Sequence, residues 1–177
     1  ASMEQVAEEA ELSKGTLYLY FKSREDLHWA ISGRGMQLLS TLLLRKLSGR
    51  MTGAGQLVEI ARCFIEFSEN QPDYVDSLLF FEGRNLEKLN LPGEQIREAF
   101  TGDSPVAILQ AAVEKGIADG SIRPGLSSAA LTHTLWAQTL GVLQIIRNKK
   151  EVFDLFGIDK QALLQSHFEI LKNGILQ

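Results

Sequence analysis

The residues best suited to chemistry lie in one short segment near the start of the chain. Small, hydroxyl-bearing and basic side chains occur there together, at the expected first turns of a helix. Backbone N–H groups in a first turn point outward and favour phosphate, and a glycine there lets the backbone approach a groove closely. Tyrosine hydroxyls can reach phosphate oxygens, and lysines add positive charge. These candidate DNA contacts are Ser13, Lys14, Gly15, Thr16, Tyr18, Tyr20 and Lys22.

Two short helices with a three-residue break between them would position this segment. The spacing of apolar residues predicts helices at Met3–Ala10 and Lys14–Phe21, followed by a long helix at Arg24–Leu47. A serine precedes each helix as a candidate N-cap, at Ser2, Ser13 and Ser23. Two short helices joined in this way have the shape of a helix-turn-helix motif.

The same residues resemble a known family. The runs SMEQVA at positions 2–7 and LSKGTLYLYFKSREDL at positions 12–27 resemble the DNA-binding domain of TetR/AcrR-type repressors. The resemblance implies that Ser2 contacts phosphate while it caps the first helix, and that residues 13–16 enter the major groove. It also implies that Tyr18, Tyr20 and Lys22 hold the DNA backbone, with Val6, Ala7, Leu17 and Phe21 as a small core.

Two features depart from the family pattern. Family members begin with a further helix, so we expect residues 1–48 to form a DNA-binding domain that is incomplete at its N-terminus, together with the connecting helix. Residues 49–177 would then form a domain for effector binding and dimerisation. The acidic side chains of residues 1–28 also outnumber the basic ones, which does not favour DNA.

The whole chain is expected to be all-α. Apolar residues recur at spacings of three and four, and alternating strand-like runs are absent. Gly53-Ala54-Gly55 forms the clearest break. The later helices are predicted at Gln56–Asn70, Tyr74–Glu82, Pro105–Asp119, Ala129–Asn148 and Lys160–Leu176, with a further helical stretch from Asn90 that residues 101–105 split.

Composition excludes several classes of protein. The 177 residues are 45% hydrophobic with a net charge of −4, which suits a packed globular protein rather than a uniformly basic one. No apolar run is long enough for a membrane span, so no membrane partner is expected. The single cysteine, Cys63, cannot form an internal disulfide, which fits a cytoplasmic location.

A ligand-responsive regulator needs an apolar pocket, and aromatic residues are candidates for its walls. Glu82, Arg84 and Asn85 could supply polar contacts. The alternative is that aromatic residues at helical spacing form ordinary core. The candidate effector residues are Phe64, Phe67, Phe80, Phe81, His133 and Trp136.

The last two long helices carry more apolar surface than one core needs, which indicates a partner surface. In the family that the chain resembles, such helices form a four-helix bundle between two subunits. The alternative is that both apolar stripes of the last helix serve one monomer. The candidate dimer residues are Ala137, Gly141, Phe168, Leu171 and Ile175.

An enzyme is not expected. Glu25 and His28 have the Glu-x-x-His spacing of di-iron helix bundles, but neither His133 nor His167 completes a second motif. We therefore expect no metal and no cofactor. The sequence predicts a homodimeric repressor released from a double-stranded DNA operator by a small apolar effector. The alternative is an α-helical ligand-binding or protein-interaction module with a degenerate DNA-binding head.

Overall fold

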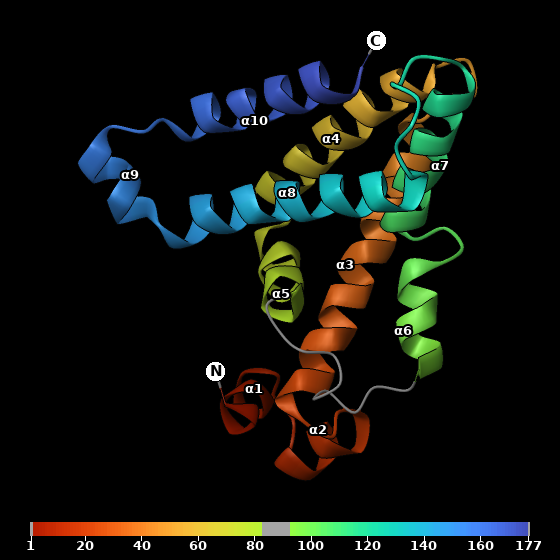
Figure 1. Cartoon of the computed structure of the whole chain (residues 1–177). Helices are drawn as coiled ribbons and strands as arrows, with labels where there is room; N and C mark the ends of the chain where they lie inside the picture. The colour runs from red at the N-terminus through yellow and green to blue at the C-terminus, as the bar shows by residue number, and fades with distance from the viewer. Residues whose placement is uncertain (1, 83–92, 177) are drawn as a thin grey trace.

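The computed structural model describes residues 2–82 and 93–176, and these residues form helices with no β-sheet (Figure 1). One isolated bridge joins Ile122 to Leu176. The all-α prediction is confirmed. The helices are α1 (Met3–Glu9), α2 (Lys14–Tyr20), α3 (Arg24–Lys46), α4 (Gly53–Asn70), α5 (Pro72–Glu82), α6 (Gly93–Phe100), α7 (Pro105–Ala118), α8 (Ser128–Asn148), α9 (Lys150–Phe156) and α10 (Lys160–Ile175).

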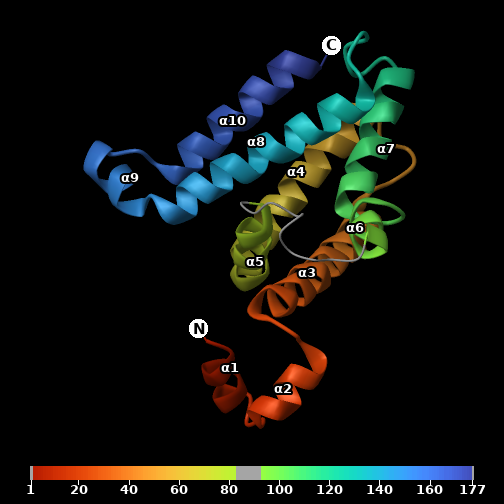
Figure 2. The same ribbon diagram turned by 60° about the horizontal axis from the view of Figure 1, so that its bottom comes forward.

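Helices α1 and α2 form a small head that projects from one end of the molecule and joins the rest through α3 (Figure 2). Its own core consists of the buried side chains of Met3, Ala7 and Leu17, with Val6, Phe21 and Leu27 packed against them. The predicted caps are confirmed, because Ser2, Ser13 and Ser23 each accept a hydrogen bond from a backbone N–H of the helix that follows.

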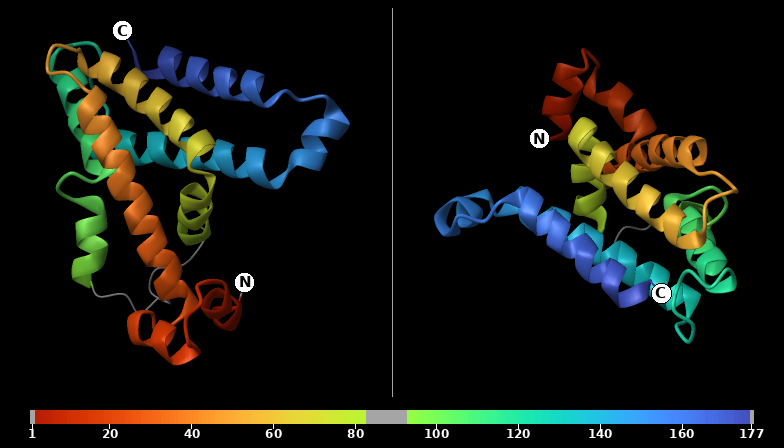
Figure 3. Two further views of the ribbon diagram at one scale, coloured as in Figure 1. Left: turned by 180° about the vertical axis from the view of Figure 1, so that it is seen from behind. Right: turned by 90° about the horizontal axis from the view of Figure 1, so that it is seen from above.

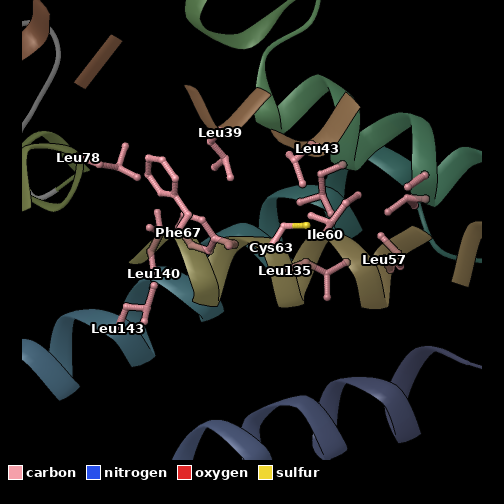
Figure 4. Close-up of a cluster of buried hydrophobic side chains, with 14 of the residues drawn as sticks. Leu39, Leu43, Leu57, Ile60, Cys63, Phe67, Leu78, Leu135, Leu140 and Leu143 are labelled. Carbon is pink, nitrogen blue, oxygen red and sulfur yellow. The ribbon is translucent and has the colours of Figure 1, made fainter. Parts of the chain in front are cut away.

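The main core lies where α3, α4, α5, α7 and α8 meet (Figures 3 and 4). Leu39 and Leu43 of α3 pack there with Phe67 of α4, and all three are almost fully buried. Helix α5 is buried over much of its surface, as its nearly continuous apolar sequence predicts. The Arg147 Nε on α8 donates to Asp76 Oδ1 on α5 at 2.5 Å and ties these helices together.

The start of α4 differs from the prediction. The glycines at 53 and 55 were expected in a break before a helix at Gln56, but α4 begins at Gly53, with Thr52 as its cap. Two side chains that follow α7 bind the first backbone N–H groups of α4. Asp119 Oδ2 accepts from Gly53 N at 2.8 Å, and Ser121 Oγ accepts from Ala54 N at 3.0 Å. A pattern of neighbouring residues in the sequence cannot predict contacts with residues so far away along the chain.

Helices α8 and α10 run side by side and are joined by α9 at one edge of the molecule (Figures 1 and 3). The sequence did not predict α9. It has seven residues, no side-chain cap and one buried residue, Phe153, so its local signal is weak. It ends at Gly157, whose φ of 63° is the left-handed conformation that commonly ends a helix.

Candidate functional site

The first turn of α2 is organised by hydrogen bonds between its own hydroxyls. Ser13 Oγ accepts from Thr16 N at 3.0 Å, and it lies 2.8 Å from Thr16 Oγ1. Capping therefore occupies Ser13, as its position before the helix predicts. An added Cβ at Gly15 would meet only Ser13 Oγ, at 3.8 Å, so no packing in the protein requires a glycine there. Its exposed backbone is open to an external partner.

The outer face of α2 exposes large side chains as well as small ones. Tyr20 is 73% exposed and Tyr18 is also exposed, so both hydroxyls are accessible. Leu19, which sequence reasoning missed, is 76% exposed between them. An exposed apolar side chain at this position can contact a thymine methyl group in a major groove. The sequence did contain a signal for Leu19: Leu17 and Phe21 already occupy the face of α2 that packs on the core of the head, so Leu19 must point elsewhere.

Lys14 is not an isolated cation. Its Nζ forms an ion pair with Glu4 Oε1 of α1, and both side chains remain more than half exposed. The hydrogen bond from Lys14 lowers the pKa of Glu4 to about 2 and raises the pKa of Lys14 itself. Lys14 Nζ also lies 5.9 Å from the centre of the Tyr18 ring. The acidic character of α1 thus acts directly on the basic residue at the start of α2.

The first turns of α3, which follow the head, pack against α5 through aromatic rings. His28 stacks on Phe80 at a centroid distance of 4.2 Å, and the Arg24 guanidinium lies 5.6 Å from the Phe80 ring centre. Trp29 contacts Phe81 edge to face at 5.1 Å. The Lys22 side chain is exposed beside this junction, and its backbone N–H donates to Asp26 Oδ2 at 3.0 Å.

A first cavity, here called the α10 cavity, lies between α10 and the helices α3, α4, α7 and α8. Its volume is about 500 Å³ and its wall is mostly apolar. Phe64 and Trp136, which stack at 5.6 Å, form part of one side, and Phe168 and Leu171 of α10 form part of another. The charged side chains in this wall are Arg62, Glu66, Glu169 and Lys172.

A second cavity, here called the α6 cavity, lies between α3, α5, α6, α7 and α8 and has a volume of about 650 Å³. Trp29 and Phe81 line it, and Trp136 belongs to the walls of both cavities. Trp136 Nε1 donates to Glu82 Oε1 at 3.2 Å. Glu82 was expected to provide a polar contact, whereas Arg84 and Asn85 lie outside the described residues.

The predicted effector residues separate into two groups. Phe64, Phe81 and Trp136 line at least one cavity. Phe67 is buried in the main core and stacks with Tyr74, Phe80 packs on His28, and the exposed His133 is hydrogen-bonded to the backbone of its own helix at Ala129 O. These last three are not in the described wall of either cavity.

The predicted dimer residues also separate. Phe168, Leu171 and Ile175 face the α10 cavity, inside the protomer. Ala137 is exposed, and a Cβ added at Gly141 would meet no atom within 4 Å, so both border open space. Further large apolar side chains are exposed on α8, α9 and α10 and in the segment between α9 and α10: Ile145, Val152, Leu155, Phe156, Ile158 and Ile170.

The remaining candidates for redox or metal chemistry, Cys63, Glu25 and His28, lie in contact with neighbouring side chains or within a helix. Burial raises the pKa of the Cys63 thiol, whose Sγ lies 3.6 Å from Glu59 Oε1. Glu25 stands in the first turn of α3, and His28 Nδ1 lies 3.5 Å from Ser77 Oγ. In the described ranges, no three His, Cys, Asp or Glu side chains are grouped so as to hold a metal ion. No helix there is long and apolar enough to cross a bilayer.

The head matches a known family. Residues 1–31 match the model of the tetR family of bacterial regulatory proteins. This segment contains α1, α2 and the start of α3, and therefore every candidate DNA contact. No curated protein sequence matches the chain.

Solved structures resemble the chain over nearly its whole length. The transcriptional regulator FadR from Bacillus subtilis, crystallised in complex with stearoyl-CoA, has a TM-score of 0.76 at 19% identity, over 98% of this chain and 88% of FadR. A TetR-family regulator from Chloroflexus aurantiacus gives 0.62 at 20% identity, over 99% and 84%. A tetR-family protein from Rhodococcus RHA1 gives 0.58 at 12%, over 93% and 85%. At these identities the likeness establishes the fold alone.

Proposed function

We propose that this chain, which has the DNA-binding segment and the fold of TetR-family regulators, is a homodimeric transcriptional repressor released from its operator by an apolar effector. The observation that carries the proposal is the head. Its second helix exposes Gly15, Tyr18 and Tyr20 to solvent. A cytoplasmic location is part of the proposal, as is the division into residues 1–48 and 49–177.

In the proposed complex, α2 enters the major groove of double-stranded DNA. Its first turn, residues 13–16, faces the bases and the nearest phosphates, with Leu19 as a further apolar contact. Tyr18, Tyr20 and Lys22 hold the backbone on either side, and Ser2 contacts phosphate from the start of α1. Phosphate contacts of this kind supply affinity and orientation, whereas contacts to base edges supply sequence preference.

We place the effector in the α10 cavity. Phe64 and Trp136 were candidate effector residues, and their cavity is mostly apolar and within the range of known ligand sites. The FadR structure holds stearoyl-CoA, which supports a long acyl chain as the class of effector. Lys172 in the wall would favour an anionic end group on such a chain, whereas Arg62 is already ion-paired with Glu59 and Glu66.

Release from DNA requires that the effector bind one conformation more tightly than the other. The α10 cavity is suited to this because Leu39 and Leu43 in its wall belong to α3, the helix that continues into the head. A shift of α3 would change the separation of the two heads in a dimer, and DNA affinity would fall by the corresponding coupling factor.

The dimer would form through α8, α9 and α10. The exposed apolar residues of these helices, with Ala137 and Gly141, provide a surface that a second copy can cover. Two-fold symmetry would present two recognition helices to a palindromic site. Phe168, Leu171 and Ile175 would support this surface from the cavity side.

One observation favours the alternative, a ligand-binding module with a degenerate head: the ion pair with Glu4 occupies Lys14. A titration of the full-length protein onto the intergenic DNA beside its own gene separates the two functions. Low and moderate salt are compared, with unrelated DNA as competitor.

A repressor should bind at two subunits per site, resist the competitor and lose affinity steeply with salt. Lys22→Ala should reduce the salt slope, whereas the matched change Lys160→Ala, at the start of α10, should not. If a genomic library also yields no site bound better than competitor DNA, the regulator proposal is wrong and the alternative stands.

A further inference from the structure

The α6 cavity has a different charge character from the α10 cavity. Its described wall contains three carboxylates, Glu82, Glu98 and Asp103, and no lysine, arginine or histidine. The wall of the α10 cavity instead contains two basic residues among its charged side chains. All three side chains are exposed to solvent, and carboxylates gathered on one wall of a cavity attract cations and repel anions.

Aromatic rings form part of the same wall. Trp29 and Phe81 meet edge to face on one side of the cavity, and Phe100 and Trp136 come from other helices. Organic cations bind favourably over the faces of aromatic rings, and tryptophan is the strongest partner. Carboxylates and indole rings in one cavity therefore select a cation with an apolar body.

A buried hydroxyl in this wall has no hydrogen-bond partner among the residues that the structure describes. Ser32 is buried, and its Oγ makes no hydrogen bond to any described residue. Its neighbours on α3 behave differently: the Ser40 and Thr41 hydroxyls donate to the backbone oxygens of Met36 and Gln37 at 2.9 Å. Buried polar groups are normally hydrogen-bonded, so an unsatisfied hydroxyl beside a cavity points to a ligand that supplies the partner.

We propose that the α6 cavity is a second ligand site, which binds an amphipathic organic cation with an aromatic body and N–H donors. The cationic end is held by Glu98 and Asp103, an N–H group satisfies Ser32, and the ring system packs against the indoles. The inference rests on the proposed function only in treating this protein as ligand-responsive.

Trp136 connects this site to the first one. Its indole N–H is bound to Glu82 in the α6 cavity, while its ring stacks on Phe64 in the α10 cavity. A cation that draws Glu82 toward itself competes with that hydrogen bond. Occupancy of one cavity therefore changes the wall of the other.

The test compares three acridines that differ in charge, using calorimetric titration of the full-length protein at pH 7.5 without DNA. 9-Aminoacridine is cationic with N–H donors, acridine is neutral, and acridine-9-carboxylate is anionic. We expect 9-aminoacridine to bind at least ten times more tightly than the carboxylate. Equal affinities for the cation and the anion would overturn the proposal.

Variants of the cavity wall test whether the acridine binds in the α6 cavity. The double change Glu98→Gln and Asp103→Asn should abolish the preference for the cation, because it removes two carboxylates while keeping side-chain size. Glu169→Gln, in the wall of the α10 cavity, is the matched control and should leave the preference intact. An unchanged preference in the double variant would place the acridine elsewhere and reject the α6 site.

Ser32→Ala provides an independent readout. It should weaken 9-aminoacridine binding several-fold while leaving the thermal midpoint of the empty protein unchanged or higher, since the hydroxyl has no partner there. A lower midpoint with unchanged binding would contradict the role given to Ser32. DNA binding of the unliganded protein is measured in parallel: its absence would count against the proposed function, whereas its presence without a cation preference would count against this site alone.

Discussion

Gly53, the first residue of α4, lies directly against the backbone of Gly116 near the end of α7. A Cβ built at Gly53 would come within 2.0 Å of Gly116 N and 2.6 Å of Ala112 O. A Cβ at Gly116 would in turn meet the Ile122 side chain at 2.4 Å. Two helices can cross this closely only where side chains are absent, so this pair sets how α4 and α7 pack beneath the main core.

Gly53→Ala should therefore destabilise the protein. The added methyl would collide with backbone that cannot move aside, and overpacking of this kind costs about 2 kcal/mol. Chemical denaturation of the variant and the parent measures the difference in free energy of unfolding. Gly174→Ala is the control, because its Cβ would meet nothing within 4 Å in α10. Equal stability of Gly53→Ala and the parent would contradict the close crossing.

Glu4→Gln should strengthen DNA binding several-fold. The change removes the ion-pair partner of Lys14 and makes its ammonium group available to phosphate. DNA affinity is measured by fluorescence anisotropy at several salt concentrations, and the salt slope should increase by about one phosphate contact. Glu8→Gln removes the same charge from α1 without affecting Lys14. If both variants gain equally, general repulsion rather than the ion pair restrains Lys14.

Acidification should weaken the packing of α10 through His167. Burial lowers the pKa of this imidazole below its ordinary value of 6.5, so the unfolded chain binds the proton more readily than the folded protein. Stability from the neutral ring is fully present above pH 6.5 and decreases as the pH falls through that value. Unfolding at pH 7.5 and 5.5 should show a smaller loss in His167→Gln than in the parent. An equal loss in both would assign the pH dependence to other groups.

A brominated long-chain fatty acid should bind in the α10 cavity and quench the fluorescence of Trp136. The chain has two tryptophans, and Trp29 does not line the α10 cavity, so Trp29→Phe isolates the signal from Trp136. A brominated C18 fatty acid should quench this fluorescence saturably, and the unbrominated acid should compete. A short-chain acid such as butyrate is the control. Absence of saturable quenching would exclude acyl chains from the α10 cavity.

Ile170→Glu should convert the proposed dimer to a monomer. Ile170 is 71% exposed on α10, and a buried carboxylate at a subunit interface would be strongly unfavourable. Light scattering after size exclusion gives the mass directly. Leu19→Glu, at an equally exposed position on the head, should leave the mass unchanged. A persisting dimer in Ile170→Glu would place the interface elsewhere.

The sequence predicted those features that depend on neighbouring residues. Ser23 caps α3 and Pro105 begins α7, because capping residues and proline act within one turn. The predicted start of α4 was wrong because it depends on distant groups. Asp119 and Ser121, more than sixty residues away, bind the first N–H groups of this helix.

The candidate site shows the same division. The face of α2 follows from helical spacing, so Tyr18 and Tyr20 could be chosen from the sequence, although Leu19 was missed. The cavities could not be predicted, because Phe64 and Phe67 stand three residues apart on one helix, yet only Phe64 lines a cavity. Which of the two meets empty space depends on where α8 and α10 cross α4, and no local pattern contains that information.

Helix α3 passes beside both cavities and continues into the head as a single rod of 23 residues, about 35 Å long. Its middle is its weakest part: Gly33 and Gly35 favour the helix least, and the Ser40 and Thr41 hydroxyls bind the backbone in a way that tends to bend helices. Helix α3 is therefore a long helix that bends most easily where it lines the cavities. A tilt of only a few degrees there displaces its far end by about 2 Å, and in the proposed DNA complex this would move α2 relative to the major groove.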